Sequence, residues 1–131
     1  MKDLEYLHER IPAYADYAEE DDRHLVDKQV RAYVGEALST LRERLGTIAG
    51  GLEDRLEQVL MMCEFTNQQL MHVMDHAHFS GDEVELLHHV DHELIEIADR
   101  AAAIEHTALE DYLSQIEALF VRRAKAVFNP N

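Results

Sequence analysis

The sequence has few of the residues that interrupt helices or cross-link chains. Its 131 residues include two prolines, five glycines, one cysteine and no tryptophan. The scarcity of proline and glycine favours long helices. Cys63 stands alone and cannot form a disulfide within the chain, so nothing indicates an oxidising compartment.

Long apolar runs are also absent. No stretch approaches the roughly 20 apolar residues that a membrane-spanning helix needs. The N-terminal MKDLEYLHER carries charges at short intervals, unlike a signal peptide. We therefore expect a cytoplasmic protein that does not associate with membranes.

Basic residues are outnumbered by acidic ones. Lys and Arg total 12 against 27 Asp and Glu, which gives a formal net charge of −15 at pH 7. Such a surface repels phosphate backbones and argues against direct nucleic-acid binding. It suits a protein partner with a basic or apolar surface, and rows of carboxylates could also imitate nucleic acid toward a basic protein.

Apolar residues recur at helical spacing along most of the chain, which predicts a single all-α domain over 1–131. Residues 1–20 are expected to form an N-terminal helical segment, with one helix ending before Pro12 and another beginning there. Residues 22–79 are expected to form one long helix or two consecutive helices. The choice depends on whether the glycine-rich stretch 46–51 is a turn.

The last predicted helix covers residues 83–128, which contain neither glycine nor proline. We expect it to be continuous or gently bent, because the alanines at 101–103 are strong helix formers. The alternative is a break near 106, since residues 107–110 match a capping box.

Ser80-Gly81-Asp82 is the clearest turn signal and is expected to centre a long antiparallel helical hairpin. The apolar positions before it follow the heptad spacing typical of a coiled coil. The hairpin would pack into a three- or four-helix bundle. If it stayed open, its exposed apolar faces would require a homodimer. The predicted seam consists of Leu52, Leu56, Val59, Cys63, Thr66, Leu70, Val73 and Ala77 before the turn, and Leu87, Val90, Leu94, Ile97, Ala101, Ile104 and Ala108 after it.

Six of the nine histidines fall within residues 72–93. If the chain reverses at Gly81, two pairs of residues spaced by four come to lie on facing edges of neighbouring helices. Imidazole and carboxylate groups suit Zn²⁺, Fe²⁺ or Ni²⁺. The candidate metal ligands are His72 and His76 from one helix and His89 and Glu93 from the other.

The same cluster has two further interpretations. Histidines are common on solvated helix edges, and clustered imidazoles beside carboxylates could sense pH at about pH 6. In the predicted register His78, His88 and His92 face away from the metal-binding edge. Asp75 and Asp91 could accept hydrogen bonds from the ligating rings.

The histidine motifs resemble in part those of hemerythrin-like proteins. His24, the two four-residue-spaced pairs and the combination of His106 with Asp111 correspond to that family's kinds of motif, but the two middle motifs stand in the opposite order. An unbroken helix would place His106, 13 residues after Glu93, about 20 Å away from it. We therefore assign the chain to no family.

Several other groups have two interpretations. The methionines of one predicted helix either fill the core or form an adaptable partner-binding surface; they are Met61, Met62, Met71 and Met74. The tyrosines near the N-terminus are expected to pack the opening helix onto the bundle while their hydroxyls stay in water. The basic group near the C-terminus compensates the helix dipole or docks on a second chain; it consists of Arg122, Arg123 and Lys125.

No catalytic constellation is complete. The chain has no phosphate-binding glycine loop, no C-x-x-C pair and no serine nucleophile elbow. We therefore expect a non-catalytic helical-bundle interaction module without a cofactor, acting as an adaptor, regulator or assembly component and forming a homo-oligomer. The alternative is a metal-binding bundle that uses the four candidate ligands.

Overall fold

The computed structural model describes residues 2–15, 17, 19, 22–64 and 81–128, and these residues form helices and no strand. The helices are α1 (Lys2–Arg10), α2 (Arg23–Leu45), α3 (Gly50–Glu64), α5 (Gly81–Asp99) and α6 (Leu109–Phe128). Two short 3₁₀ helices, η2 (Arg100–Ala103) and η3 (His106–Ala108), lie between α5 and α6. The predicted all-α fold is confirmed.

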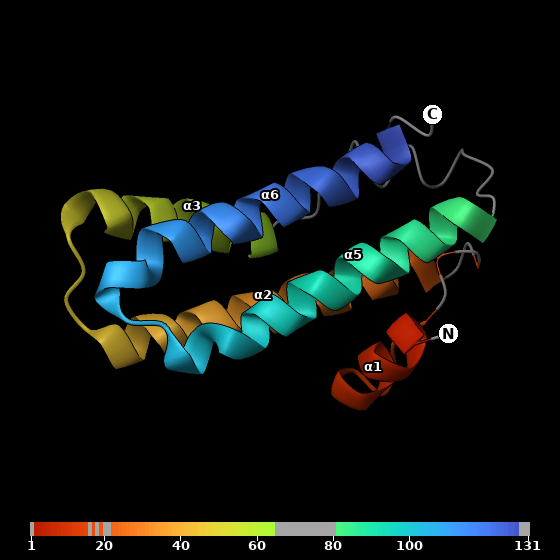
Figure 1. Cartoon of the computed structure of the whole chain (residues 1–131), viewed down its shortest axis with the longest axis horizontal. Helices are drawn as coiled ribbons and strands as arrows, with labels where there is room; N and C mark the ends of the chain where they lie inside the picture. Colours follow the sequence, from red (N-terminus) through yellow and green to blue (C-terminus); the bar gives the residue numbers. More distant parts are fainter. Residues whose placement is uncertain (1, 16, 18, 20–21, 65–80, 129–131) are drawn as a thin grey trace.

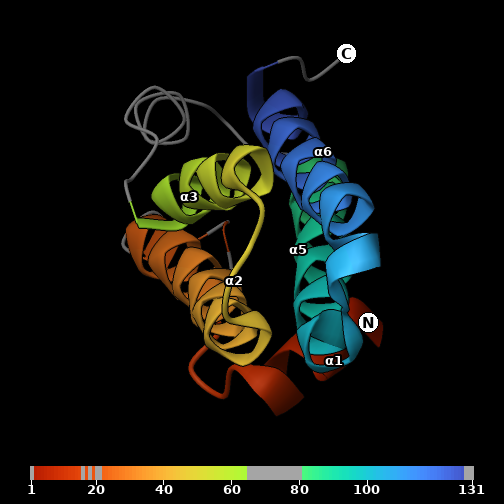
Figure 2. The same ribbon diagram turned by 90° about the vertical axis from the view of Figure 1, so that its left-hand side faces the viewer.

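Four of the helices form a bundle of two hairpins. The α2–α3 hairpin packs beside the α5–α6 hairpin, and the reversals that join each pair lie at the same end (Figure 1). Seen along the bundle, α2 contacts α5 in one layer and α3 contacts α6 in the other, while α1 lies against α5 outside the bundle (Figure 2). None of the described helices is long and apolar enough to cross a membrane.

Helix α2 buries one apolar stripe and ends at a glycine that no other residue replaces easily. Its residues at spacings of three and four are buried; they are Val26, Val30, Val34, Leu38, Leu41 and Leu45. Gly46 follows with a φ of 69°, and its N–H bonds to the carbonyl of Arg42 at 3.1 Å. The stretch 46–51 therefore contains a turn. Within the described part of 22–79 the chain forms two consecutive helices, and residues 65–79 lie outside that part.

The N-terminal segment is helical only up to Arg10, so the expected second helix beginning at Pro12 is wrong. Side chains take the carbonyls that such a helix would use internally. Nε2 of His8 bonds to the carbonyl of Tyr14 at 2.8 Å, and Nε of Arg23 donates to the carbonyl of Tyr17 at 2.8 Å. The described residues from Ile11 to Glu19 thus form no regular helix.

The predicted continuous helix over 83–128 is also wrong, because α5 ends at Asp99 and α6 begins only at Leu109. Distant side chains cap the end of α5. Nη2 of Arg44 donates to the carbonyls of Ala101, at 2.8 Å, and Ile104, and the Tyr112 hydroxyl donates to the carbonyl of Ile97 at 2.6 Å. With these carbonyls satisfied, the chain reverses despite its alanines and α6 packs back on α5.

The hairpin predicted about Gly81 falls partly on residues 65–80, outside the described residues, and stays a prediction. Among the described helices, α5 packs mainly on α6, α2 and α1. The predicted seam residues of α5 are buried there; they are Leu87, Val90, Leu94 and Ile97. Since this seam is covered within one chain, it gives no reason of its own for a homodimer.

Candidate functional site

A polar cluster lies inside the bundle, centred on Asp91 of α5, which has no exposed area. Oδ2 of this carboxylate accepts hydrogen bonds from the hydroxyls of Tyr14, at 2.8 Å, and Tyr17. Its Oδ1 accepts a hydrogen bond from Nε of Arg123 at 2.8 Å. Asp91 therefore joins the N-terminal segment to both α5 and α6.

Arg123 extends the cluster to α2. Its Nη1 donates to Oδ1 of Asp27 at 2.6 Å, and its Nη2 donates to the Tyr17 hydroxyl at 2.6 Å. Asp27 also accepts a hydrogen bond from Nε of Arg31 at 2.8 Å, and Nη1 of Arg31 donates to the carbonyl of Cys63 at 3.0 Å. Charges this deeply buried are tolerated because they are paired and hydrogen-bonded.

The hydrogen bonds around Tyr14 indicate which ring nitrogen of His88 carries a proton. Tyr14 has a single hydroxyl proton, which it donates to Asp91. Nδ1 of His88 lies 2.8 Å from the same hydroxyl oxygen, so this ring nitrogen acts as the donor. A directed chain of donors thus runs from His88 through Tyr14 to Asp91.

Burial also fixes the charge states of the cluster. Burial first, and then the negative charge of Asp91, raises the pKa of Tyr14 far above the ordinary tyrosine value. Burial would lower the pKa of Arg123, but its acidic neighbours raise it well above the usual value. The tyrosines are therefore neutral donors and the arginine stays charged. The cluster is closed off from solvent and binds the helices together.

Two of the four predicted metal ligands lie in the described part of the chain. Nε2 of His89 is 3.0 Å from Oε1 of Glu93, so this pair shares an edge as predicted. However, Nδ1 of His89 faces Asp3 at 3.6 Å, and Nη1 of Arg122 donates to Glu93 at 2.8 Å. Among the described residues no group of three or more His, Cys, Asp or Glu could hold a metal ion. His72 and His76 lie outside those residues.

His92, three residues after His89 on α5, holds α1 against the bundle. His92 stacks on Tyr6 with ring centroids 4.0 Å apart, and its Nδ1 is 2.6 Å from Oδ1 of Asp3. Burial alone would raise the pKa of Asp3, but the hydrogen bond from His92 and the nearby His89 lower it below 3.8. The described partners of Asp91 are two tyrosines and an arginine, so its predicted support of a metal-ligating ring is not seen among them.

The sequence analysis missed most of the polar cluster. Arg123 was expected to compensate the helix dipole or to dock on a second chain, but it is 2% exposed. Tyr14 and Tyr17 bury the hydroxyls that were expected in water. One signal was present: the pattern H-x-x-D-H occurs at 72–76 and again at 88–92. In the second copy, the His and Asp spaced by three both face the core.

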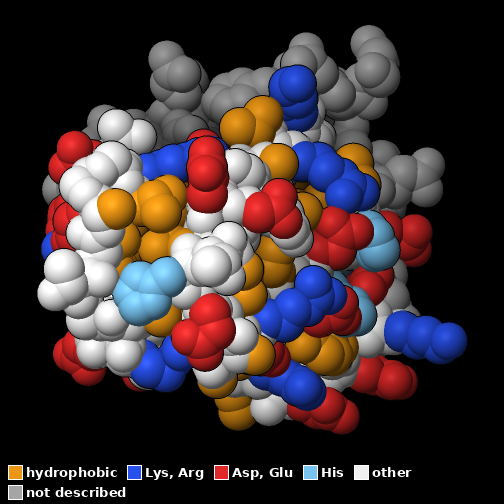
Figure 3. Space-filling model, turned by 60° about the vertical axis from the view of Figure 1, so that its left-hand side comes forward, with side chains coloured by type: hydrophobic (Ala, Val, Ile, Leu, Met, Phe, Trp, Pro, Cys, Tyr) orange, Lys and Arg blue, Asp and Glu red, His pale blue; other side chains and the backbone are white. Residues whose placement is uncertain are grey.

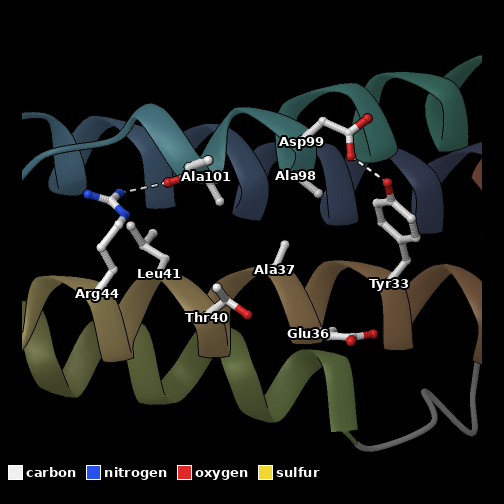
Figure 4. A pocket seen from close by; sticks show the side chains of 10 residues that line it. Tyr33, Glu36, Ala37, Thr40, Leu41, Arg44, Ala98, Asp99 and Ala101 are labelled. Carbon is white, nitrogen blue, oxygen red and sulfur yellow. Dashed lines mark hydrogen bonds between the residues drawn. The ribbon is translucent and has the colours of Figure 1, made fainter.

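A groove of about 430 Å³ runs between α2 and α5. Its floor is made largely of Ala37, Leu41 and Ala98, while Tyr33 bonds to Asp99 at one end and Arg44 bonds to the Ala101 carbonyl at the other (Figure 4). The polar groups at both ends are engaged within the protein. The groove therefore offers mainly apolar surface.

Charges of both signs are interspersed on the surface. On the face shown in Figure 3, carboxylates and basic side chains alternate, with apolar side chains between them. Many of the charges are paired, as in the contacts of Arg42 with Glu57 at 2.5 Å and of Arg55 with Glu117 at 3.2 Å. On this face the net negative charge is not gathered into one row of carboxylates.

Comparison of the chain with protein-family models, with curated proteins and with solved structures found no match.

Proposed function

We propose that this protein is a non-catalytic interaction module, a rigid acidic bundle that binds another protein chain through the outer surface of α3 and α6. One observation carries the proposal. Met61, Met62 and Val121 are 51%, 37% and 49% exposed, although the bundle buries its core within one chain. The partner-surface interpretation of the methionines is thus favoured for these two over core filling.

Helices α3 and α6, which carry the three exposed side chains, contact each other in one layer and run in the same general direction (Figure 1). The register is fixed where Arg55 of α3 donates to Ser114 at 2.7 Å and to Glu117 at 3.2 Å on α6. Two turns further along, Met62 lies on the α6-facing edge of α3 and Val121 on the α3-facing edge of α6. Met61 extends this apolar patch, which we call the α3/α6 patch.

A patch of this kind is suited to protein binding. Methionine side chains are flexible and polarisable, so they adapt to different partner surfaces. Contiguous exposed apolar residues with a polar rim mark interaction sites more often than isolated ones do. The ionisable groups of the polar cluster are buried, and this supports a role without catalysis.

A photo-crosslinking amino acid at position 121 tests the proposal. In cells that produce the protein naturally, it is expected to give a covalent adduct with a protein chain. The same group at Leu86, which is 40% exposed on α5, serves as the control and should give far less. Equal yields at both positions, or no adduct with any protein at 121, would contradict the proposal.

A second candidate function is binding of Zn²⁺, Fe²⁺ or Ni²⁺ by His72, His76, His89 and Glu93. Its support is the 3.0 Å separation of His89 Nε2 from Glu93 Oε1. Elemental analysis of untagged protein, beside a variant with His72→Ala and His89→Ala, tests it. Equal metal content in the two samples would remove this function.

A further inference from the structure

We infer that helix α1 detaches reversibly from α5 while the rest of the bundle stays folded, and that it acts as a lid over a buried face of α5. Helix α1 lies outside the bundle against α5 (Figure 2). The α3/α6 patch plays no part in this lid, so the two features are independent.

The apolar attachment of α1 is small. Among the described helices α1 packs chiefly on α5. Leu7 is its one fully buried side chain, whereas Leu4 and Tyr6 are only partly buried. Since nine residues are too few to form a stable helix alone, α1 loses its helical structure when it leaves α5.

The remaining contacts of α1 with α5 are polar and lie at the rim. Oδ1 of Asp3 is 2.6 Å from Nδ1 of His92. Nε of Arg10 donates to Oδ2 of Asp99 at 3.2 Å, and both of these side chains are 35% exposed. Ion pairs that are open to water contribute little to stability. The free energy needed to open α1 is therefore well below that needed to unfold the bundle.

The chain that follows α1 is anchored much more firmly. Tyr14 and Tyr17 are buried and donate hydrogen bonds to the buried carboxylate of Asp91. His8 links α1 to this anchored chain by bonding to the carbonyl of Tyr14 at 2.8 Å. Residues 11–13 between them are not helical and form the hinge. Helix α1 thus opens at the hinge without breaking the polar cluster.

A buried stripe of α5 lies beneath α1. His92 stacks on Tyr6, and Asp99 accepts a hydrogen bond from the Tyr6 hydroxyl at 3.2 Å. Ile95 lies between these two positions at spacings of three and four, so it is on the same face of α5. Its side chain has no exposed area. The neighbouring Leu94 is equally buried but belongs to the seam that packs inside the bundle.

Opening of α1 enlarges the apolar surface that the groove between α2 and α5 offers. Asp99 lines this groove and also accepts hydrogen bonds from Tyr6 and Arg10 of α1. Ile95 lies about one turn before Asp99 and becomes accessible when α1 leaves. The closed lid hides this apolar surface, and the open lid presents it to solvent.

Thiol labelling measures the opening directly. In a Cys63→Ala background, Ile95→Cys places a thiol beneath α1, whereas Leu94→Cys places one in the seam. The pair is closely matched, because the two residues are adjacent and neither has any exposed area. Without denaturant, Ellman's reagent should react at least about tenfold faster at position 95, since reaction there needs only local opening. Equal rates at the two positions would overturn the inference.

Hydrogen exchange tests the wild-type protein without any substitution. Amides of α1 should exchange at least about 100-fold faster than those at the centre of α2. Low concentrations of urea should hardly change the rate in α1, because its opening exposes little surface, but should accelerate exchange in α2. Equal rates with equal urea dependence would show that α1 is an integral part of the bundle and would also overturn the inference.

Two leucine substitutions separate the attachment of α1 from the stability of the bundle. Leu7→Ala should accelerate exchange in α1 at least about tenfold, since it removes the buried apolar contact. Leu38→Ala, at an equally buried position of α2, should accelerate exchange in α2 and leave α1 unchanged within about twofold. If Leu38→Ala does not fold, Val34→Ala removes less volume and gives the same comparison. Equal acceleration of α1 and α2 by the change in α2 would contradict local opening.

Discussion

Replacing Asp91 with alanine should destabilise the protein more than any change at a surface carboxylate. Asp91 is fully buried and accepts hydrogen bonds from Tyr14, Tyr17 and Arg123. Without it, both tyrosine hydroxyls lose their acceptor and Arg123 keeps Asp27 as its remaining carboxylate partner in the cluster. A buried positive charge is then left only partly compensated.

The expected loss is about 3–5 kcal/mol in the free energy of unfolding, the usual cost of breaking a buried ion pair from one side. The chain contains an unusually close control. Asp99 accepts hydrogen bonds from the same residue types, Tyr6, Tyr33 and Arg10, but its side chain is 35% exposed. Asp99→Ala should cost at most about 1 kcal/mol, because water solvates the groups that lose their partner.

Urea denaturation followed by circular dichroism measures both changes against the wild-type protein. A domain of this size is expected to be stable by about 5–15 kcal/mol. Asp99→Ala should therefore fold and give a complete transition, and Asp91→Ala should do so unless the wild-type stability lies at the lower end of that range. Two results would refute the reasoning that removing a partner from the cluster is costly because the cluster is buried. One is an equal loss of unfolding free energy in the two variants, and the other is a loss below about 1 kcal/mol for Asp91→Ala.

Three further predictions concern local features. Burial raises the pKa of the Cys63 thiol to about 12, so Ellman's reagent should react with it slowly at neutral pH and rapidly in urea; fast reaction of the folded protein would contradict this. Gly46→Ala should lower the free energy of unfolding by about 1–3 kcal/mol, because φ is 69° and ψ is −121° there. At Gly51 an added methyl group meets open space, so Gly51→Ala should stabilise the protein by up to about 1 kcal/mol. Thermal melts that ranked the two variants in the reverse order would refute the assignment of the turn. The lowered pKa of Asp3 means that its carboxylate contributes stability above its ordinary value of 3.8, and this contribution is lost as pH falls through the lowered pKa. The difference in stability between wild type and Asp3→Asn should therefore be present at pH 5 and vanish in strong acid, and a pH-independent difference would exclude the contact with His92 as its cause.

Local patterns correctly identified the parts of the chain whose structure depends on neighbours in sequence. The apolar residues of α2, spaced by three and four, predicted its buried face from Val26 to Leu45. The glycines at 46–51 allowed a turn, and Gly46 provides it with a backbone conformation that side chains disfavour. Of the candidate metal site, the spacing of His89 and Glu93 predicted their closeness, since four residues return to the same helix face.

Longer-range contacts decided what those patterns left open or got wrong. The alanines at 101–103 favour helix by themselves, yet Arg44 from α2 bonds to carbonyls at that point and the chain reverses. A sequence pattern gives no information on which distant donor will reach those carbonyls. For the same reason the spacing of His89 and Glu93 did not reveal that Asp3 and Arg122 would engage them.

The sequence by itself determined that this chain is helical, where α2 lies and which apolar residues form the buried seam of α5, because helix periodicity is a property of neighbouring residues. Only the tertiary structure decided that Tyr14, Tyr17, Asp91 and Arg123 meet inside the bundle. In sequence they look like surface residues, since the free energy of burying a charge depends on partners that folding brings from elsewhere in the chain. The tertiary structure likewise left Met62 and Val121 on the surface, because no described helix covers the faces of α3 and α6 on which they lie.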